Sequence, residues 1–150
     1  MQAAAKIHGP ADEAYKIREM RLGANWFFWV AIAGVANSLL IYFFSISSLF
    51  FGLGMTHYID NHFTFDGLGG RFVTGLLANI GIALVLAGFG YLSRRGNDVA
   101  FIIGMFLYVF DTIVVLGYRE FFAFGFHLMA LFFMFKGLLA SRRRYDPSVE

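Results

Sequence analysis

The sequence predicts an all-α membrane protein, an antiparallel bundle of four transmembrane helices, because four long apolar runs alternate with shorter polar segments. Hydrophobic residues make up 59% of the 150 residues, whereas soluble domains are roughly 45–50% apolar. The runs cover residues 26–46, 72–92, 99–117 and 121–140. Each is close to the roughly 20 residues that a helix needs to cross about 30 Å of hydrocarbon. None has the alternation of a barrel strand, so we expect helices.

Positive charges gather on one side of this predicted topology. Ten of the 12 Lys and Arg residues precede the first run, separate the second from the third, or lie at the end of the fourth: Lys6, Lys16, Arg18, Arg21, Arg94, Arg95, Lys136, Arg142, Arg143 and Arg144. Because cytoplasmic flanks are enriched in Lys and Arg, both termini are expected in the cytoplasm. We expect a bacterial cytoplasmic membrane. The same placement explains the basic character of the chain without a nucleic-acid partner.

The chain is interpreted as one integral membrane domain, with a juxtamembrane segment at 1–25 and a basic tail at 141–150. Residues 12–22 are expected to form a separate short helix at the inner membrane surface. Basic side chains in both segments are candidates for binding lipid head groups: Arg18, Arg21, Arg142, Arg143 and Arg144. The alternative is that these charges only orient the chain in the membrane.

The connections between the runs differ in length. Residues 93–98 and 118–120 form short turns, which force neighbouring helices to pack antiparallel. The connection at 47–71 is longer, with an apolar start and a polar end. From this pattern we expect an extra helix, interfacial or re-entrant, over residues 48–61 on the outer side.

Each predicted span carries a polar residue near its middle: Asn37, Asn79, Asp111 and His127. Counting along the helices places all four in the outer half, within about 4 Å in depth, which suggests one polar layer. A carboxylate in mid-membrane costs about 2.5–3.5 kcal/mol on insertion scales, so Asp111 should be protonated, paired or hydrated. Asp111 precedes the 118–120 turn by seven residues and His127 follows it by seven. The two should therefore meet on adjacent helices.

Small residues indicate which helix faces pack together. One stripe on the fourth span joins Ala123, His127, Ala130 and Gly137, and one face of the third joins Gly104, Tyr108 and Asp111. The second span is different, because its small stripe (Thr74, Ala78, Gly81 and Gly88) does not contain Asn79, which lies on the Gly75 side. This span can use one face for its own bundle and the other for a second subunit.

A cluster of possible metal ligands lies in the long connection: His57, Asp60, His62 and Asp66. Their residue types suit a divalent metal, but the spacing matches no established motif. Haem would need two facing His residues, and His127 is the sole candidate within a span. The absence of Cys excludes disulfides and thiolate sites. We therefore predict no cofactor, although lipid can bind.

These patterns leave three functions open. The first is a non-enzymatic structural or accessory subunit that forms homo-oligomers or joins a membrane complex. The second is a small carrier or channel for a proton, an ion or a polar lipid, which uses Asp111 and His127. The third is a membrane enzyme with a His/Asp site at the outer surface. No nucleophile–base arrangement can be identified, which argues against an enzyme.

Overall fold

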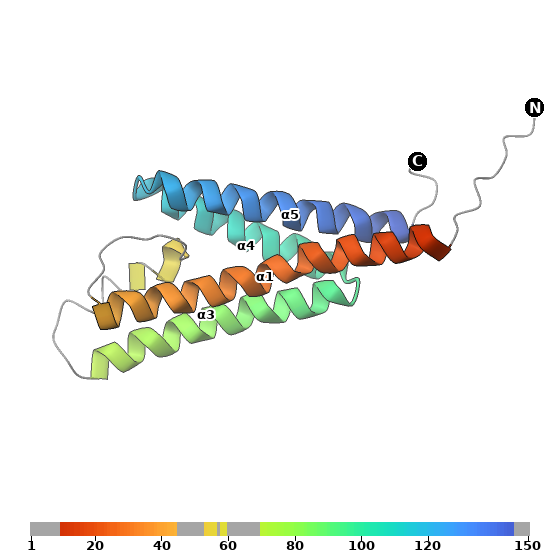
Figure 1. Cartoon of the computed structure of the whole chain (residues 1–150). Coiled ribbons are helices and arrows are strands. Elements are labelled where there is room, and N and C mark those ends of the chain that lie inside the picture. The colour runs from red at the N-terminus through yellow and green to blue at the C-terminus, as the bar shows by residue number, and fades with distance from the viewer. Residues whose placement is uncertain (1–9, 45–52, 57, 60–69, 146–150) are drawn as a thin grey trace, which may run out of the picture.

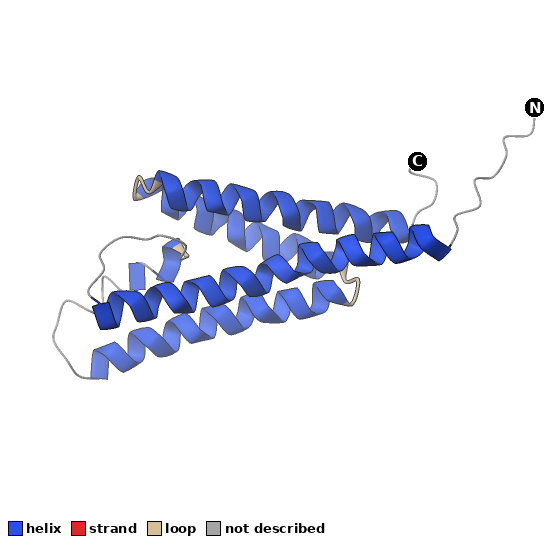
Figure 2. Cartoon of the chain, viewed as in Figure 1, coloured by secondary structure: helices blue, strands red, loops and turns tan. Residues whose placement is uncertain are grey.

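The computed structural model describes residues 10–44, 53–56, 58–59 and 70–145 (Figures 1 and 2). Four long helices account for most of them: α1 (Pro10–Phe44), α3 (Gly70–Arg94), α4 (Asp98–Gly117) and α5 (Phe121–Tyr145). All four are long and apolar enough to cross a membrane. A further short helix lies between α1 and α3, with helical residues at 54–56 and 58–59. The predicted fold class is confirmed, and the chain is a polytopic membrane protein.

The four helices form a ring in which α1 packs against α3 and α5, and α4 packs against the same two helices. Tight turns create the antiparallel order visible in Figure 1. Between α3 and α4, Gly96 adopts a positive φ of 82°, and the Asn97 side chain caps α4 by accepting from the backbone N–H of Ala100. Between α4 and α5, Arg119 adopts a φ of 61°. These turns set the order of α3, α4 and α5, and the start of α1 lies at the same end of the bundle as the end of α5 (Figure 1).

Helix α1 corrects the expectation of a separate surface helix at residues 12–22. It runs without a break through 35 residues, about 52 Å at ~1.5 Å per residue, longer than about 30 Å of hydrocarbon. Its first part packs along the end of α5, where Glu19 lies 3.7 Å from Lys136 and Lys16 donates to the backbone oxygen of Arg143 at 3.4 Å. The expectation was wrong because no proline separates this segment from the first apolar run, and Gly23 stays helical where it packs against α5.

Close contact between α1 and α5 depends on Gly23 and Gly137. A Cβ atom added to Gly23 would lie 2.5 Å from the Cα atom of Gly137. The two backbones therefore touch, as small residues allow in membrane helices. The predicted packing stripe on α5 is confirmed, since Ala123, His127, Ala130 and Gly137 are all buried.

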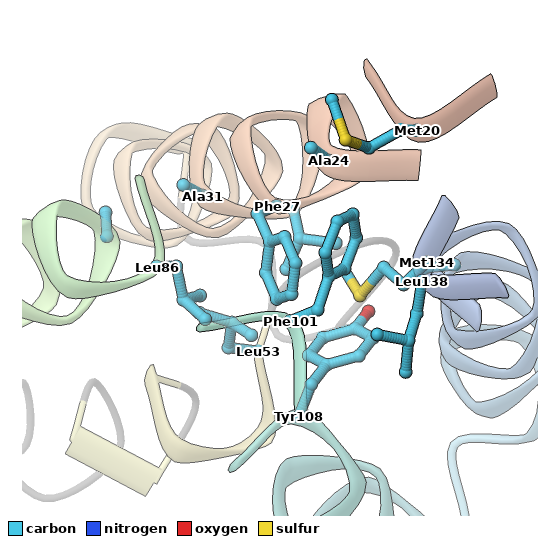
Figure 3. Packing of buried hydrophobic residues seen from close by; sticks show 13 residues of the cluster. Met20, Ala24, Phe27, Ala31, Leu53, Leu86, Phe101, Tyr108, Met134 and Leu138 are labelled. Atoms are coloured by element: carbon cyan, nitrogen blue, oxygen red, sulfur yellow. The ribbon is translucent and has the colours of Figure 1, made fainter. Parts of the chain in front are cut away.

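An apolar core fills the centre of the ring (Figure 3). Phe27 of α1 and Phe101 of α4 are both fully buried, and their ring centroids are 6.0 Å apart. Gly104 makes room for Phe27, whose Cε1 atom would lie 2.6 Å from an added Cβ. Large apolar side chains also cover the outside of the bundle, among them Trp29, Phe43, Leu84, Phe106 and Phe121. An apolar exterior over an apolar core is what a bilayer solvent requires.

Candidate functional site

The contact predicted between Asp111 and His127 is confirmed. The Nε2 atom of His127 lies 2.9 Å from Oδ2 of Asp111, and the pair joins α4 to α5. His127 is 0% exposed and Asp111 is 8% exposed. Both positions follow from the turn at 118–120, which sets the two residues at equal height on neighbouring helices.

The short helix supplies the other partners of Asp111. The backbone N–H of Gly54 donates to Oδ2 at 3.0 Å, and that of Met55 donates to Oδ1 at 2.8 Å. Each carboxyl oxygen thus accepts a backbone hydrogen bond from the first residues of the helix, in the manner of a capping side chain. The carboxyl group ties three parts of the chain together: the short helix, α4 and α5.

The geometry limits where the protons of this pair can lie. The Nδ1 atom of His127 is 2.7 Å from the carbonyl oxygen of Ala123, which can only accept, so Nδ1 carries a hydrogen. One further hydrogen lies between Nε2 and Oδ2. It belongs either to an imidazolium facing a carboxylate or to a carboxylic acid facing a neutral imidazole. Both arrangements give the pair zero net charge, as an apolar interior favours.

Aromatic and hydroxyl side chains surround the pair. The Tyr108 ring stacks on the His127 ring, with centroids 4.7 Å apart and planes inclined by 9°. Thr112 donates to the backbone oxygen of Tyr108 at 2.8 Å. The Tyr108 hydroxyl is buried without a hydrogen-bond partner among the residues that the structure describes. Tyr108 also belongs to the apolar core cluster that contains Phe101, and Figure 3 labels both side chains in that core.

One side of the short helix is buried against the bundle, whereas Met55 and Tyr58 are about half exposed. Leu53 is 3% exposed and Thr56 is 1% exposed. Leu53 reaches across to α1, where its Cδ1 atom would lie 3.2 Å from a Cβ added to Gly34. Gly54 packs on α4 so closely that a Cβ atom would lie 2.9 Å from the Cγ2 atom of Val115. Residues 53–56 therefore bridge α1 and α4 within the ring.

The other predicted polar residues occupy two further places. Asn79 on α3 donates to the Ser38 hydroxyl of α1 at 2.8 Å, and Ser38 donates to the backbone oxygen of Gly34 at 3.2 Å. Asn37 lines a groove on the outside of the bundle between α1 and α5, together with Trp26 and Phe126. The predicted polar layer thus comprises a pair joining α4 to α5, a pair joining α1 to α3, and Asn37 in a groove.

The remaining site predictions have no geometric test in the structure. His57, Asp60, His62 and Asp66, the candidate metal ligands, lie outside the described residues. The candidate head-group ligands Arg18, Arg21, Arg142 and Arg143 are exposed, and the side chain of Arg144 lies outside the described part.

Sequence reasoning missed the backbone donors of Gly54 and Met55. Backbone amides carry no residue-specific signal, and the available indication was the small residue Gly54 after an apolar run. A comparison with protein-family models, curated proteins and solved structures finds no match to this chain. The fold and the site define a four-helix membrane protein with a buried acid–histidine pair.

Proposed function

We propose that this protein is a non-enzymatic membrane component, a structural or accessory subunit that assembles with copies of itself or with another membrane protein. The observation that carries the proposal is the complete internal pairing of Asp111 and His127. Both ring nitrogens and both carboxyl oxygens have protein partners. A catalytic or transport site keeps a position for its substrate, whereas a structural junction uses every donor and acceptor internally.

The surface of α3 supports assembly with another chain. Asn79 faces the bundle, whereas Gly81 and Gly88 lie on the exposed side with nothing within 4 Å of an added Cβ atom. Small residues at an open helix face allow a second helix to approach closely in a membrane. One face of α3 would thus pack inside the bundle, and the opposite face, with Gly81 and Gly88, would pack against a partner chain.

Crosslinking in native membranes tests this function, followed by mass analysis of the crosslinked species. We expect a discrete complex that is lost in Gly81→Leu and Gly88→Leu. Gly125→Leu is the matched control, because Gly125 on α5 is likewise helical and open, with nothing within 4 Å of an added Cβ. A strictly monomeric protein, or equal loss in all three variants, would contradict assembly through α3.

A proton or ion carrier is the second candidate, favoured by one observation. A cavity of about 430 Å³ between α3 and α4 is lined by Asp111 and Tyr108 together with apolar side chains. Because Asp111 lines this cavity, a proton or ion in the cavity could reach the carboxyl group of the pair. Flux measurements in liposomes distinguish the candidates. Proton or ion flux that falls in Asp111→Asn favours a carrier, and equal flux in both proteins removes Asp111 from any transport mechanism.

A further inference from the structure

The outer surface of the bundle is recessed along the contact between α1 and α3, which lie side by side (Figure 1). This groove has a volume of about 480 Å³, and its lining residues in the described part of the chain are all apolar. It extends along α1 from residue 31 to residue 39, about 12 Å at ~1.5 Å per residue. One leaflet of a bilayer contains about 15 Å of hydrocarbon, half of the ~30 Å total. Short side chains leave this space open beside their larger neighbours: Ala31, Ala36, Ala83 and Ala87.

Arg94 lies at the end of this groove that is nearest to the α3–α4 turn. It is the last residue of α3 and follows Ala87 by two turns on the same helix face, about 10 Å along the axis. Its Cζ atom is 5.9 Å from the centroid of the Phe28 ring on α1. Phe28 in turn lies against Gly90, where an added Cβ atom would be 2.9 Å from the Cε2 atom of the ring. Arg94 therefore reaches across the contact between α1 and α3, just beyond the apolar groove.

Arg95 and Arg21 add positive charge at the same end of the groove. The Cζ atom of Arg95 is 4.6 Å from the centroid of the Tyr91 ring, and Arg21 precedes Phe28 by two turns on the same face of α1. All three arginines are exposed, and none of them forms an ion pair with another described residue. Stacking on an aromatic ring uses the face of a guanidinium group and leaves the N–H groups at its edge for an anion.

The charges at the end of the groove distinguish between classes of membrane lipid. The end of a spanning helix lies near the level of the lipid phosphates, and a guanidinium group can donate two parallel hydrogen bonds to phosphate oxygens. A zwitterionic lipid would also bring a cationic amine beside the arginines. The carboxylate that follows them in the chain, Asp98, accepts from Ser141 of α5. A lipid with net negative charge is therefore the complementary occupant.

We propose that the groove between α1 and α3 binds an anionic glycerophospholipid. One acyl chain lies in the groove, and Arg94 and Arg95 donate to the phosphate oxygens at the membrane surface. Arg21 contributes a further positive charge there. This site is separate from the Asp111–His127 pair and does not depend on assembly through the face of α3 that carries Gly81 and Gly88.

Native mass spectrometry of the purified full-length protein in detergent tests the head-group contacts. Phosphatidylglycerol and phosphatidylcholine with identical acyl chains are titrated separately. Wild type should form one saturable adduct with phosphatidylglycerol and bind phosphatidylcholine about fivefold more weakly or worse. The double variant Arg94→Gln with Arg95→Gln should bind phosphatidylglycerol about ten- to thirtyfold more weakly, since each basic residue near a membrane surface contributes a factor of roughly five.

The double variant Arg142→Gln with Arg143→Gln is the matched control. It removes the same charge from exposed residues of α5, a helix that contributes no described residue to the groove. It should bind phosphatidylglycerol as wild type does. Equal weakening in both double variants would show diffuse attraction to a basic surface and would overturn the proposal. Equal binding of the two lipids by wild type would overturn it as well.

A second pair of variants tests the position of the acyl chain. Ala87→Phe should lose the saturable adduct, because the ring occupies the space of the chain. Val109→Phe changes an exposed apolar residue of α4 outside the groove, and it should keep the adduct. Binding by Ala87→Phe at wild-type strength would contradict the proposal. The arginine variants change exposed side chains only, so they decide the proposal even if Ala87→Phe does not fold.

Two further measurements distinguish other occupants. Displacement of the lipid by inorganic phosphate would show that the arginines hold a phosphate without its acyl chains. A disulfide-linked dimer of Ile32→Cys would assign the groove to a second copy of the chain, because Ile32 lines it and is exposed. Either result overturns the proposal, whereas a monomeric Ile32→Cys protein and a lipid adduct that resists phosphate support it.

Discussion

Asp111 and His127 share a single hydrogen between Oδ2 and Nε2 across 2.9 Å, at the junction of α4 and α5. The carboxyl also accepts from the backbone of residues 54 and 55, so the pair links segments that are far apart in the chain. Its removal should therefore affect the whole bundle and not a single helix contact.

The first prediction concerns the coupling between these two side chains. Asp111→Ala leaves His127 Nε2 and two backbone amides without partners, which should destabilise the protein by about 3–5 kcal/mol. Thermal unfolding in detergent of Asp111→Ala, His127→Leu and the double variant measures the coupling. The loss of unfolding free energy in the double variant should be smaller than the sum of the losses in the two single variants by about 1–3 kcal/mol.

A distant hydrogen bond gives the control for this cycle. The Ser141 hydroxyl donates to Asp98 where α5 ends and α4 begins. Ser141→Ala combined with Asp111→Ala should be additive. Additive effects for Asp111 and His127 as well would show that their contact contributes no coupling.

The second prediction separates a carboxylate from an amide at position 111. Asp111→Asn keeps the shape but replaces one accepting oxygen with an NH₂ group. That group must face the N–H of Gly54 or of Met55, because the carboxyl oxygens accept from both. One backbone donor then loses its acceptor, at a cost of about 1–3 kcal/mol. Hydrogen exchange at Gly54 or at Met55 should accelerate relative to wild type, and unchanged protection of both amides would contradict this geometry.

The third prediction tests the close approach of the short helix to α4. Gly54→Ala adds a methyl group within 3.0 Å of the Val114 side chain and the Val115 backbone nitrogen. The segment must move away from α4, which should destabilise the protein by about 1–3 kcal/mol. Gly125→Ala, at an open helical position, should instead stabilise it by about 0.5–1 kcal/mol. The unfolding temperatures of both variants and wild type are measured in the same detergent. Equal shifts in the two variants would show that a methyl group at position 54 is accommodated beside α4.

The fourth prediction concerns orientation. The bias of Lys and Arg toward the termini predicts that both ends of the chain are cytoplasmic. The chain has no Cys, so Ser148→Cys and Thr64→Cys each create a single labelling site. A membrane-impermeant thiol reagent should label Thr64→Cys in intact cells and should label Ser148→Cys only after permeabilisation. Labelling of Ser148→Cys from outside intact cells would show that the orientation is the reverse of the predicted one.

Much of the fold followed from the lengths of the apolar runs, because a bilayer restricts spanning segments to helices of a set length. The Asp111–His127 contact was predictable for a similar reason, since a tight turn fixes the heights of residues on both sides. Helix α1 was predicted less well. A short surface helix and a straight extension of a span have similar sequences, and the contact between Gly23 and Gly137 that holds the extension is a tertiary feature.

The partners of Asp111 were only half predictable. Counting from the turn identified His127, but the donors from residues 54 and 55 are backbone atoms in a long, irregular connection. Asn37 and Asn79 have similar depths on their helices, yet Asn79 meets Ser38 in the bundle and Asn37 lines an outer groove. Rotation about the helix axis separates these outcomes, and depth alone does not determine it.

The chain order of the Asp111 partners has a consequence for biogenesis. Residues 54 and 55 precede α4, whereas His127 follows it and emerges from the ribosome later. While α4 is the last span made, its carboxyl group lacks the imidazole, and burying it in the bilayer costs about 2.5–3.5 kcal/mol on translocon scales. This cost is removed when α5 folds back beside α4. The Asp111 carboxyl group therefore gains its side-chain partner only after α5 folds back beside α4, and a chain truncated before residue 127 should integrate α4 less efficiently than the full chain.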